Sequence, residues 1–82
     1  MLDRRFGRFV IDIDTINGSP EVVRHILGEV IVFEASTDYP RGVVDYQARC
    51  DAFEPVEAGA TVPTYDILFD PETNIVSWSA AA

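Results

Sequence analysis

The carboxylates of Asp12 and Asp14 are the first residues in this sequence that could do chemistry. They fall on the same side of an alternating segment, Arg8 to Asp14, which predicts a strand. Two carboxylates at that spacing can bind a hard cation such as Mg²⁺ or Ca²⁺, or act as an acid/base pair. Such ions need further oxygen ligands, and no EF-hand loop is present. The pattern therefore favours a solvated strand face, and we predict no metal site.

His25 and Cys50 are the only histidine and the only cysteine. Neither lies in a sequence context typical of a nucleophile and its base. Cys50 falls on the apolar side of a predicted strand, so we interpret it as a core residue and His25 as a surface residue. The glycines are isolated and form no phosphate-binding loop. We therefore predict no catalytic residues, no cofactor and no enzymatic activity.

Two predicted strands carry polar side chains on one face. These are Asp45, Gln47, Arg49 and Asp51 on one strand, and Thr64, Asp66, Leu68 and Asp70 on the other. If the strands are neighbours, they form an acidic patch whose predicted partner-binding residues are Asp45, Asp51, Asp66 and Asp70. Alternate carboxylates along a strand lie roughly 6.6–7 Å apart, close to the phosphate repeat of an extended nucleic acid. The face could therefore imitate a nucleic acid, or it could be the wet surface of an acidic protein.

The overall charge narrows the classes of partner. The chain has no lysine, and its six arginines stand against 14 carboxylates, for a net charge of -8. This balance disfavours direct binding to nucleic acids and to anionic membranes, and favours a protein partner with a basic surface. We expect no signal peptide, and the longest apolar run, Val30 to Phe33, is too short to span a membrane. These features favour a cytoplasmic protein of a bacterium or a phage-infected cell.

The elements that would position these residues follow from periodicity and turn chemistry. After the strand at 8–14, with Phe9, Ile11 and Ile13 inward, Ser19-Pro20 predicts the start of a short helix and Gly28 its end. Residues 29–36 are ambiguous between a strand and a continued helix, and the β-branched run favours a strand. Further strands are predicted at 43–51, 64–70 and 75–78, with hairpin turns at 38–42 and 70–74, a loop at 52–63 and a frayed tail at 79–82.

This order predicts a single small α+β domain spanning residues 1–82. Its expected architecture is a mostly antiparallel sheet of about five strands with one short helix packed on one face, in the order β-α-β-β-β-β. In the loop, Phe53 and Val56 are expected to act as anchors, Gly59 to permit a turn and Pro63 to open the next strand.

The segment from Phe53 to Gly59, continuing through Pro63 to Ile67, has the pattern F-x-x-V-x-x-G followed by P-x-Y. In this C-terminal half the chain resembles small uncharacterised bacteriophage accessory proteins. The resemblance implies a phage origin, but it implies no activity and supplies no catalytic residues.

Three function classes follow. We expect a small acidic, non-enzymatic interaction protein, phage-encoded, that binds and modulates or inhibits a host or phage protein. The alternative is a small-ligand-binding or sequestering protein that acts as a homodimer. The third class, a metal-dependent hydrolase using Asp12 and Asp14, has the least support because so few catalytic groups converge.

Overall fold

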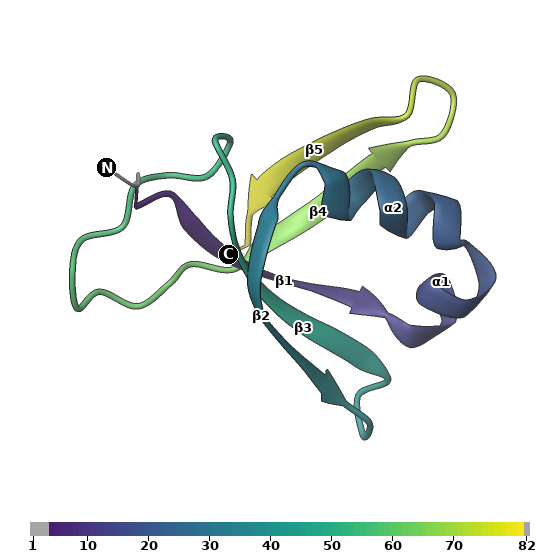
Figure 1. The fold of residues 1–82 in the computed structure, drawn as a ribbon, viewed down its shortest axis with the longest axis horizontal. Coiled ribbons are helices and arrows are strands. Elements are labelled where there is room, and N and C mark those ends of the chain that lie inside the picture. The colour runs from purple at the N-terminus through teal and green to yellow at the C-terminus, as the bar shows by residue number, and fades with distance from the viewer. Residues whose placement is uncertain (1–3, 82) are drawn as a thin grey trace.

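The computed structural model describes residues 4–81 and has an α+β fold. Antiparallel strands form two sheets, and two short helices accompany them. Figure 1 shows both helices on one side of the molecule and the long loop before β4 on the opposite side. In chain order the elements are β1 (Phe6–Asp12), α1 (Ile13–Gly18), α2 (Pro20–Gly28), β2 (Ile31–Asp38), β3 (Val43–Arg49), β4 (Tyr65–Asp70) and β5 (Ile75–Ala80).

The strands divide into a three-stranded sheet with the order β1-β3-β2 and a two-stranded sheet of β4 and β5. β1 pairs with β3 along its whole length, from Phe6 opposite Arg49 to Asp12 opposite Val43. On its other side β1 meets the residues just before β4 through one parallel bridge, Arg8 to Thr64, supported by a 2.9 Å hydrogen bond from the Arg8 amide to the Pro63 carbonyl. The single sheet expected from sequence is therefore two sheets that touch beside β1.

Both predicted hairpins are confirmed. β2 and β3 pair antiparallel, as do β4 and β5. Gly42 ends the first turn with a φ of 67°, and Asn74 ends the second with a φ of 58°. These left-handed conformations suit glycine and asparagine better than other residues, which explains why the turns fall where the sequence predicts them.

The first strand differs from its prediction. β1 ends at Asp12, and the next residues form α1, so the chain has two helices where one was expected. Phe9 and Ile11 are buried as predicted, but Ile13 is half-buried inside α1 together with Ile16. Ile13 fits the two-residue period of the strand and also the i, i+3 spacing of a helix, so periodicity alone could not locate the boundary.

The helix predicted after Ser19 is confirmed as α2. Its amides at Val22 and Val23 donate to the Ser19 backbone carbonyl, and the Ser19 side chain makes no capping hydrogen bond. Val23 and Ile26 form the buried stripe. The helix ends at Gly28, and Ile31–Asp38 is a strand, so the ambiguity over residues 29–36 is settled in favour of a strand.

β5 is longer than predicted. Ser79 and Ala80, expected to belong to a frayed tail, pair with Asp66 and Tyr65 of β4. The Ala81 amide adds a 2.9 Å hydrogen bond to the Thr64 carbonyl. Serine and alanine side chains are not typical of strands, so the sequence did not predict this extension. The backbone of Ser79 and Ala80 pairs with β4 and lengthens the two-stranded sheet. Ala82 lies outside the described residues.

Aromatic side chains join the two sheets in the core. The Trp78 ring of β5 lies 5.0 Å from the Phe9 ring of β1 and 5.0 Å from the Phe53 ring of the long loop. Phe9 stacks on Tyr46 of β3, and Phe53 stacks on Tyr65 of β4 at 4.4 Å. Each such pair contributes about 0.5–1.5 kcal/mol beyond its buried area, so this chain of rings compensates for the sparse backbone pairing between the sheets.

Candidate functional site

The site is built on one face of the three-stranded sheet, which we call the outer face. Phe9 and Tyr46 point from β1 and β3 into the core. Because side chains alternate along a strand, their neighbours Arg8, Asp45 and Gln47 point the other way. β2 extends this face, since its Glu34 lies opposite Gln47 and its Ser36 lies opposite Asp45. The polar residues of the outer face around the site are Arg8, Glu34, Ser36, Asp38, Asp45 and Gln47.

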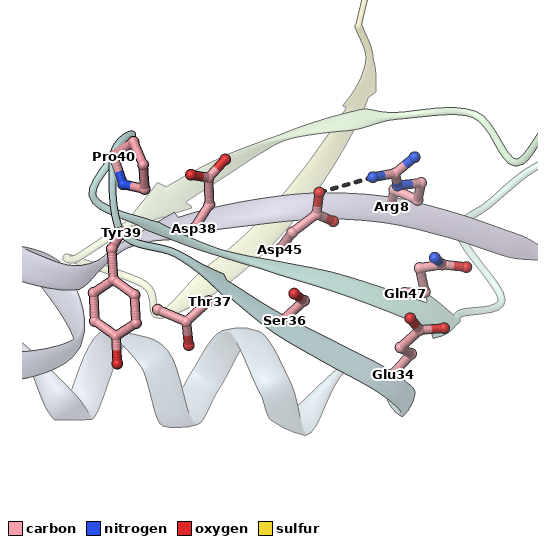
Figure 2. Close-up of a pocket in the computed structure, with 9 residues that line it drawn as sticks. All are labelled: Arg8, Glu34, Ser36, Thr37, Asp38, Tyr39, Pro40, Asp45 and Gln47. Carbon is pink, nitrogen blue, oxygen red and sulfur yellow. Dashed lines mark hydrogen bonds and ion pairs between the residues drawn. The ribbon is translucent and has the colours of Figure 1, made fainter.

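A hollow of about 460 Å³ lies over the outer face and reaches the β2–β3 turn. Figure 2 shows Tyr39 and Pro40 at its turn end, Glu34 and Gln47 at its other end, and the Arg8–Asp45 ion pair between them. Its lining residues are Arg8, Glu34, Ser36, Thr37, Asp38, Tyr39, Pro40, Asp45 and Gln47.

Three carboxylates and one guanidinium set the charge of this hollow. Arg8 Nη2 donates to Asp45 Oδ2 at 2.8 Å, so this pair is neutral as a unit. Asp38 lies 3.7 Å from Arg41, which is itself exposed, and accepts the Arg41 amide proton at 3.4 Å. Glu34 adds a further exposed carboxylate. The hollow is therefore net negative even after its internal ion pair forms.

Tyr39 lines the hollow at its turn end and is 80% exposed. Figure 2 shows its ring pointing away from the carboxylates of Asp38 and Asp45. The groups of the hollow that can bind a cation are therefore its carboxylates, which accept hydrogen bonds from guanidinium and ammonium groups. The arrangement can bind the side chain of an arginine or a lysine.

Asp12 and Asp14 do not form the pair that the sequence suggested. Asp12 is the last residue of β1, and Asp14 lies in the first turn of α1, so the two carboxylates no longer share a strand face. Within residues 4–81, no group of three His, Cys, Asp or Glu side chains is close enough to hold a metal ion.

The four predicted partner-binding residues are only partly brought together. β1 lies between β3 and β4, so the two acidic strands are not neighbours. Asp45 and Asp66 line one depression together with Arg8 and Arg41.

The other two lie elsewhere. Asp51 forms a 2.8 Å ion pair with Arg49, just beyond β3. Asp70, at the end of β4, accepts the Glu72 amide proton at 2.9 Å within the β4–β5 turn.

Glu34, Asp38 and Tyr39 are site residues that the sequence analysis missed. The signal was present, because Glu34, Ser36 and Asp38 alternate along a single segment. It was hidden by the ambiguity over residues 29–36, since only a strand places these three side chains on one face.

Cys50 and His25 lie as predicted. Cys50 is buried in the core, and His25 is exposed on α2, with its ring 5.9 Å from that of Phe69.

None of the helices in the described part of the chain has the length and apolar character to cross a membrane. Comparisons with protein-family models, curated proteins and solved structures gave no match.

Proposed function

We propose that this chain is a small, non-enzymatic interaction protein of phage origin that binds a protein partner with a basic surface and so modulates or inhibits it. One observation carries the proposal: the outer face gathers Glu34, Asp38 and Asp45 around a hollow with an exposed Tyr39. The net charge of -8 adds a long-range attraction for a basic partner. A host protein whose basic groove normally takes nucleic acid fits this charge pattern.

The polar lining of the hollow and its open position on the sheet favour a protein partner over a small ligand. Small-ligand sites are mostly apolar and bury most of the ligand surface. This hollow is lined largely by polar side chains and lies on an open sheet face bordered by the exposed strand β2. Such a surface suits the polar, partly hydrated contact of two proteins.

The experiment compares two isosteric double variants with equal net charge. Glu34→Gln with Asp38→Asn neutralises the outer face, whereas Glu57→Gln with Glu72→Gln removes two exposed carboxylates elsewhere. Each immobilised protein is used to capture partners from host lysate at about 50 and 150 mM salt, where surface charges are progressively screened. Thermal unfolding followed by the fluorescence of Trp78, the single tryptophan, verifies that both variants fold.

We expect one protein to be retained by the wild type and by the Glu57/Glu72 variant, and to be lost from the Glu34/Asp38 variant. Equal retention by both variants would show that the outer face is not the binding surface. No retained protein at either salt concentration would contradict the proposed function itself.

A further inference from the structure

β2 is an edge strand with an open side. It pairs with β3 along one edge, and no strand in the described part of the chain pairs with its other edge. Seven of its eight residues are exposed, among them Ile31 at 65% and Phe33 at 54%. An open edge of this kind presents a row of backbone donors and acceptors ready to pair with another chain.

The usual protections of an edge strand are sparse here. Lysine and proline, which block pairing on many natural edges, are absent from Ile31–Asp38. The register shifts between Val32 and Glu34, so the strand is irregular at that point. From Glu34 to Asp38 the pairing with β3 is continuous, which leaves this stretch regular and open.

The negative charge beside the open edge of β2 determines which kind of chain can pair with it. Glu34 and Asp38 lie on the outer face of β2, and Asp45 follows behind them on β3. Side chains of a strand added beside β2 would be direct neighbours of Glu34 and Asp38, and opposite charges across strands stabilise a sheet whereas like charges destabilise it. A second copy would bring two further carboxylates and another net charge of -8 to the same place. A cationic strand is therefore favoured over self-pairing.

We infer that the partner supplies an extended basic segment that adds to the β2 edge as a further strand. This inference rests on the proposed function and specifies the mode of binding. Alternate residues of the segment are arginine or lysine and face Glu34 and Asp38, whose positions along β2 are roughly 13 Å apart. The residues between them are apolar and cover the exposed Ala35, which lies opposite the core residue Tyr46 of β3. Backbone hydrogen bonds supply affinity, and the alternating side chains supply specificity.

The test uses labelled peptides of eight residues, the length of β2, with both termini chemically blocked. The first alternates arginine and valine, and the second alternates glutamate and valine. Two further arginine–valine peptides are N-methylated, one at the arginines and the other at the valines. In an added strand only alternate N–H groups face the sheet, so one methylated peptide loses those donors and the other keeps them.

We expect the arginine–valine peptide to bind and the glutamate–valine peptide not to bind. One of the two methylated peptides should lose affinity about tenfold or more, because several backbone hydrogen bonds are removed together. Binding should slow amide hydrogen exchange in Ile31–Asp38. It should weaken in the Glu34→Gln, Asp38→Asn variant and persist in the Glu57→Gln, Glu72→Gln variant.

Three outcomes would overturn the inference. Equal loss or equal retention by the two methylated peptides, with β2 exchange unchanged, would show charge attraction without strand addition and leave the proposed function intact. No binding of the arginine–valine peptide would remove the inferred ligand class, whereas lysate capture still tests the function separately. A dimer of the free protein with protected β2 amides would show that a second copy occupies the edge.

Discussion

At the scale of single residues, the N-terminal arginines hold the fold together as well as contributing charge. Arg4 Nε donates to the Val56 carbonyl at 2.8 Å, and Arg5 Nη1 donates to the Phe53 carbonyl at 2.9 Å. Arg8 forms the ion pair within the hollow. Three of the six arginines lie within the first eight residues, but the sequence did not show that two of these side chains hold the loop before β4 in place. A guanidinium suits that task because it carries several donors in a fixed geometry.

Gly7 is required by close packing. A Cβ atom at this position would lie 2.7 Å from ring carbons of Phe53 and 2.8 Å from the Tyr65 ring. These rings are stacked on each other and cannot easily move aside. Gly7→Ala should therefore lower the free energy of unfolding by about 1–3 kcal/mol, measured by urea denaturation with Trp78 fluorescence.

The matched control for Gly7 is Gly28→Ala, where an added Cβ meets nothing within 4 Å. Gly28 ends α2, so alanine should leave stability unchanged or raise it slightly. A Gly7→Ala protein as stable as the Gly28→Ala protein would contradict the packing argument.

The buried hydroxyl of Tyr46 makes the free energy of unfolding depend on pH in the alkaline range. Burial raises the pKa of its hydroxyl above the ordinary value of 10.0. At a pH where the unfolded chain has begun to lose this proton, the folded chain still holds it, so the unfolded state binds fewer protons and stability falls as pH rises. Below that range the residue is neutral in both states and contributes no pH dependence.

Tyr46→Phe keeps the ring that stacks on Phe9 and removes the ionisable group. The free energy of unfolding, measured from about pH 8 to 11, should decline less steeply in this variant than in the wild type. Tyr39→Phe is the matched control, because it removes the same hydroxyl from a residue that is 80% exposed and lies outside the core. A Tyr46→Phe profile parallel to the wild type would refute the assignment.

At the scale of elements, local chemistry determined what the sequence could predict. β3 alternates between apolar and polar residues from Val44 to Arg49. The loop before β4 has clear anchors in the buried Phe53 and Val56 and a clear turn in Gly59, at φ 83°. α1 could not be predicted, because its first apolar residue, Ile13, also satisfied the two-residue period of the preceding strand. β2 gave a weak signal for a different reason: a strand that no other element covers is under no pressure to alternate between apolar and polar residues.

The end of β5 provides a prediction about pairing. Removal of residues 79–82 deletes the partners of Asp66 and Tyr65 and the hydrogen bond from Ala81 to Thr64. Since each lost backbone bond costs about 1 kcal/mol, the truncated chain should be destabilised by roughly 1–3 kcal/mol in urea denaturation.

A chain that ends at Ala81 keeps all of these pairings and serves as the control. If the two truncated chains unfold at the same urea concentration, the last residues of β5 contribute nothing to stability.

At the scale of the whole molecule, the sequence predicted the fold class and the two hairpins but not how the hairpins and β1 lie relative to one another. The acidic patch depended on β3 lying beside β4, but β1 lies between them. Asp51 falls beyond the end of β3 and Asp70 at the end of β4, so neither joins the depression that Asp45 and Asp66 share. Strand order is set by long-range packing, here by Trp78 between Phe9 and Phe53, and no local pattern encodes it. The charge itself, in contrast, is a property of the composition and holds for any arrangement of strands.

That charge has a consequence for stability that does not depend on a partner. With 14 carboxylates and only six arginines, the chain carries an excess of negative charge. These like charges repel one another more strongly in the compact folded state than in the expanded unfolded chain. The ion pairs Arg8–Asp45, Arg41–Asp38 and Arg49–Asp51 are all partly or largely exposed, and exposed pairs contribute at most about 1 kcal/mol each. Added salt screens both effects, and the excess of negative charge makes repulsion the larger one.

The melting temperature should therefore rise when NaCl is increased from about 10 to 150 mM, as the screening length shortens towards 8 Å. Glu57→Gln with Glu72→Gln changes the net charge from -8 to -6, because it removes two carboxylates. This variant should be more stable than the wild type at low salt and should gain less from added NaCl, because less repulsion remains to be screened. A melting temperature that falls with salt would mean that the three ion pairs outweigh the repulsion, and that the acidic outer face is stabilised internally rather than left available for a basic partner.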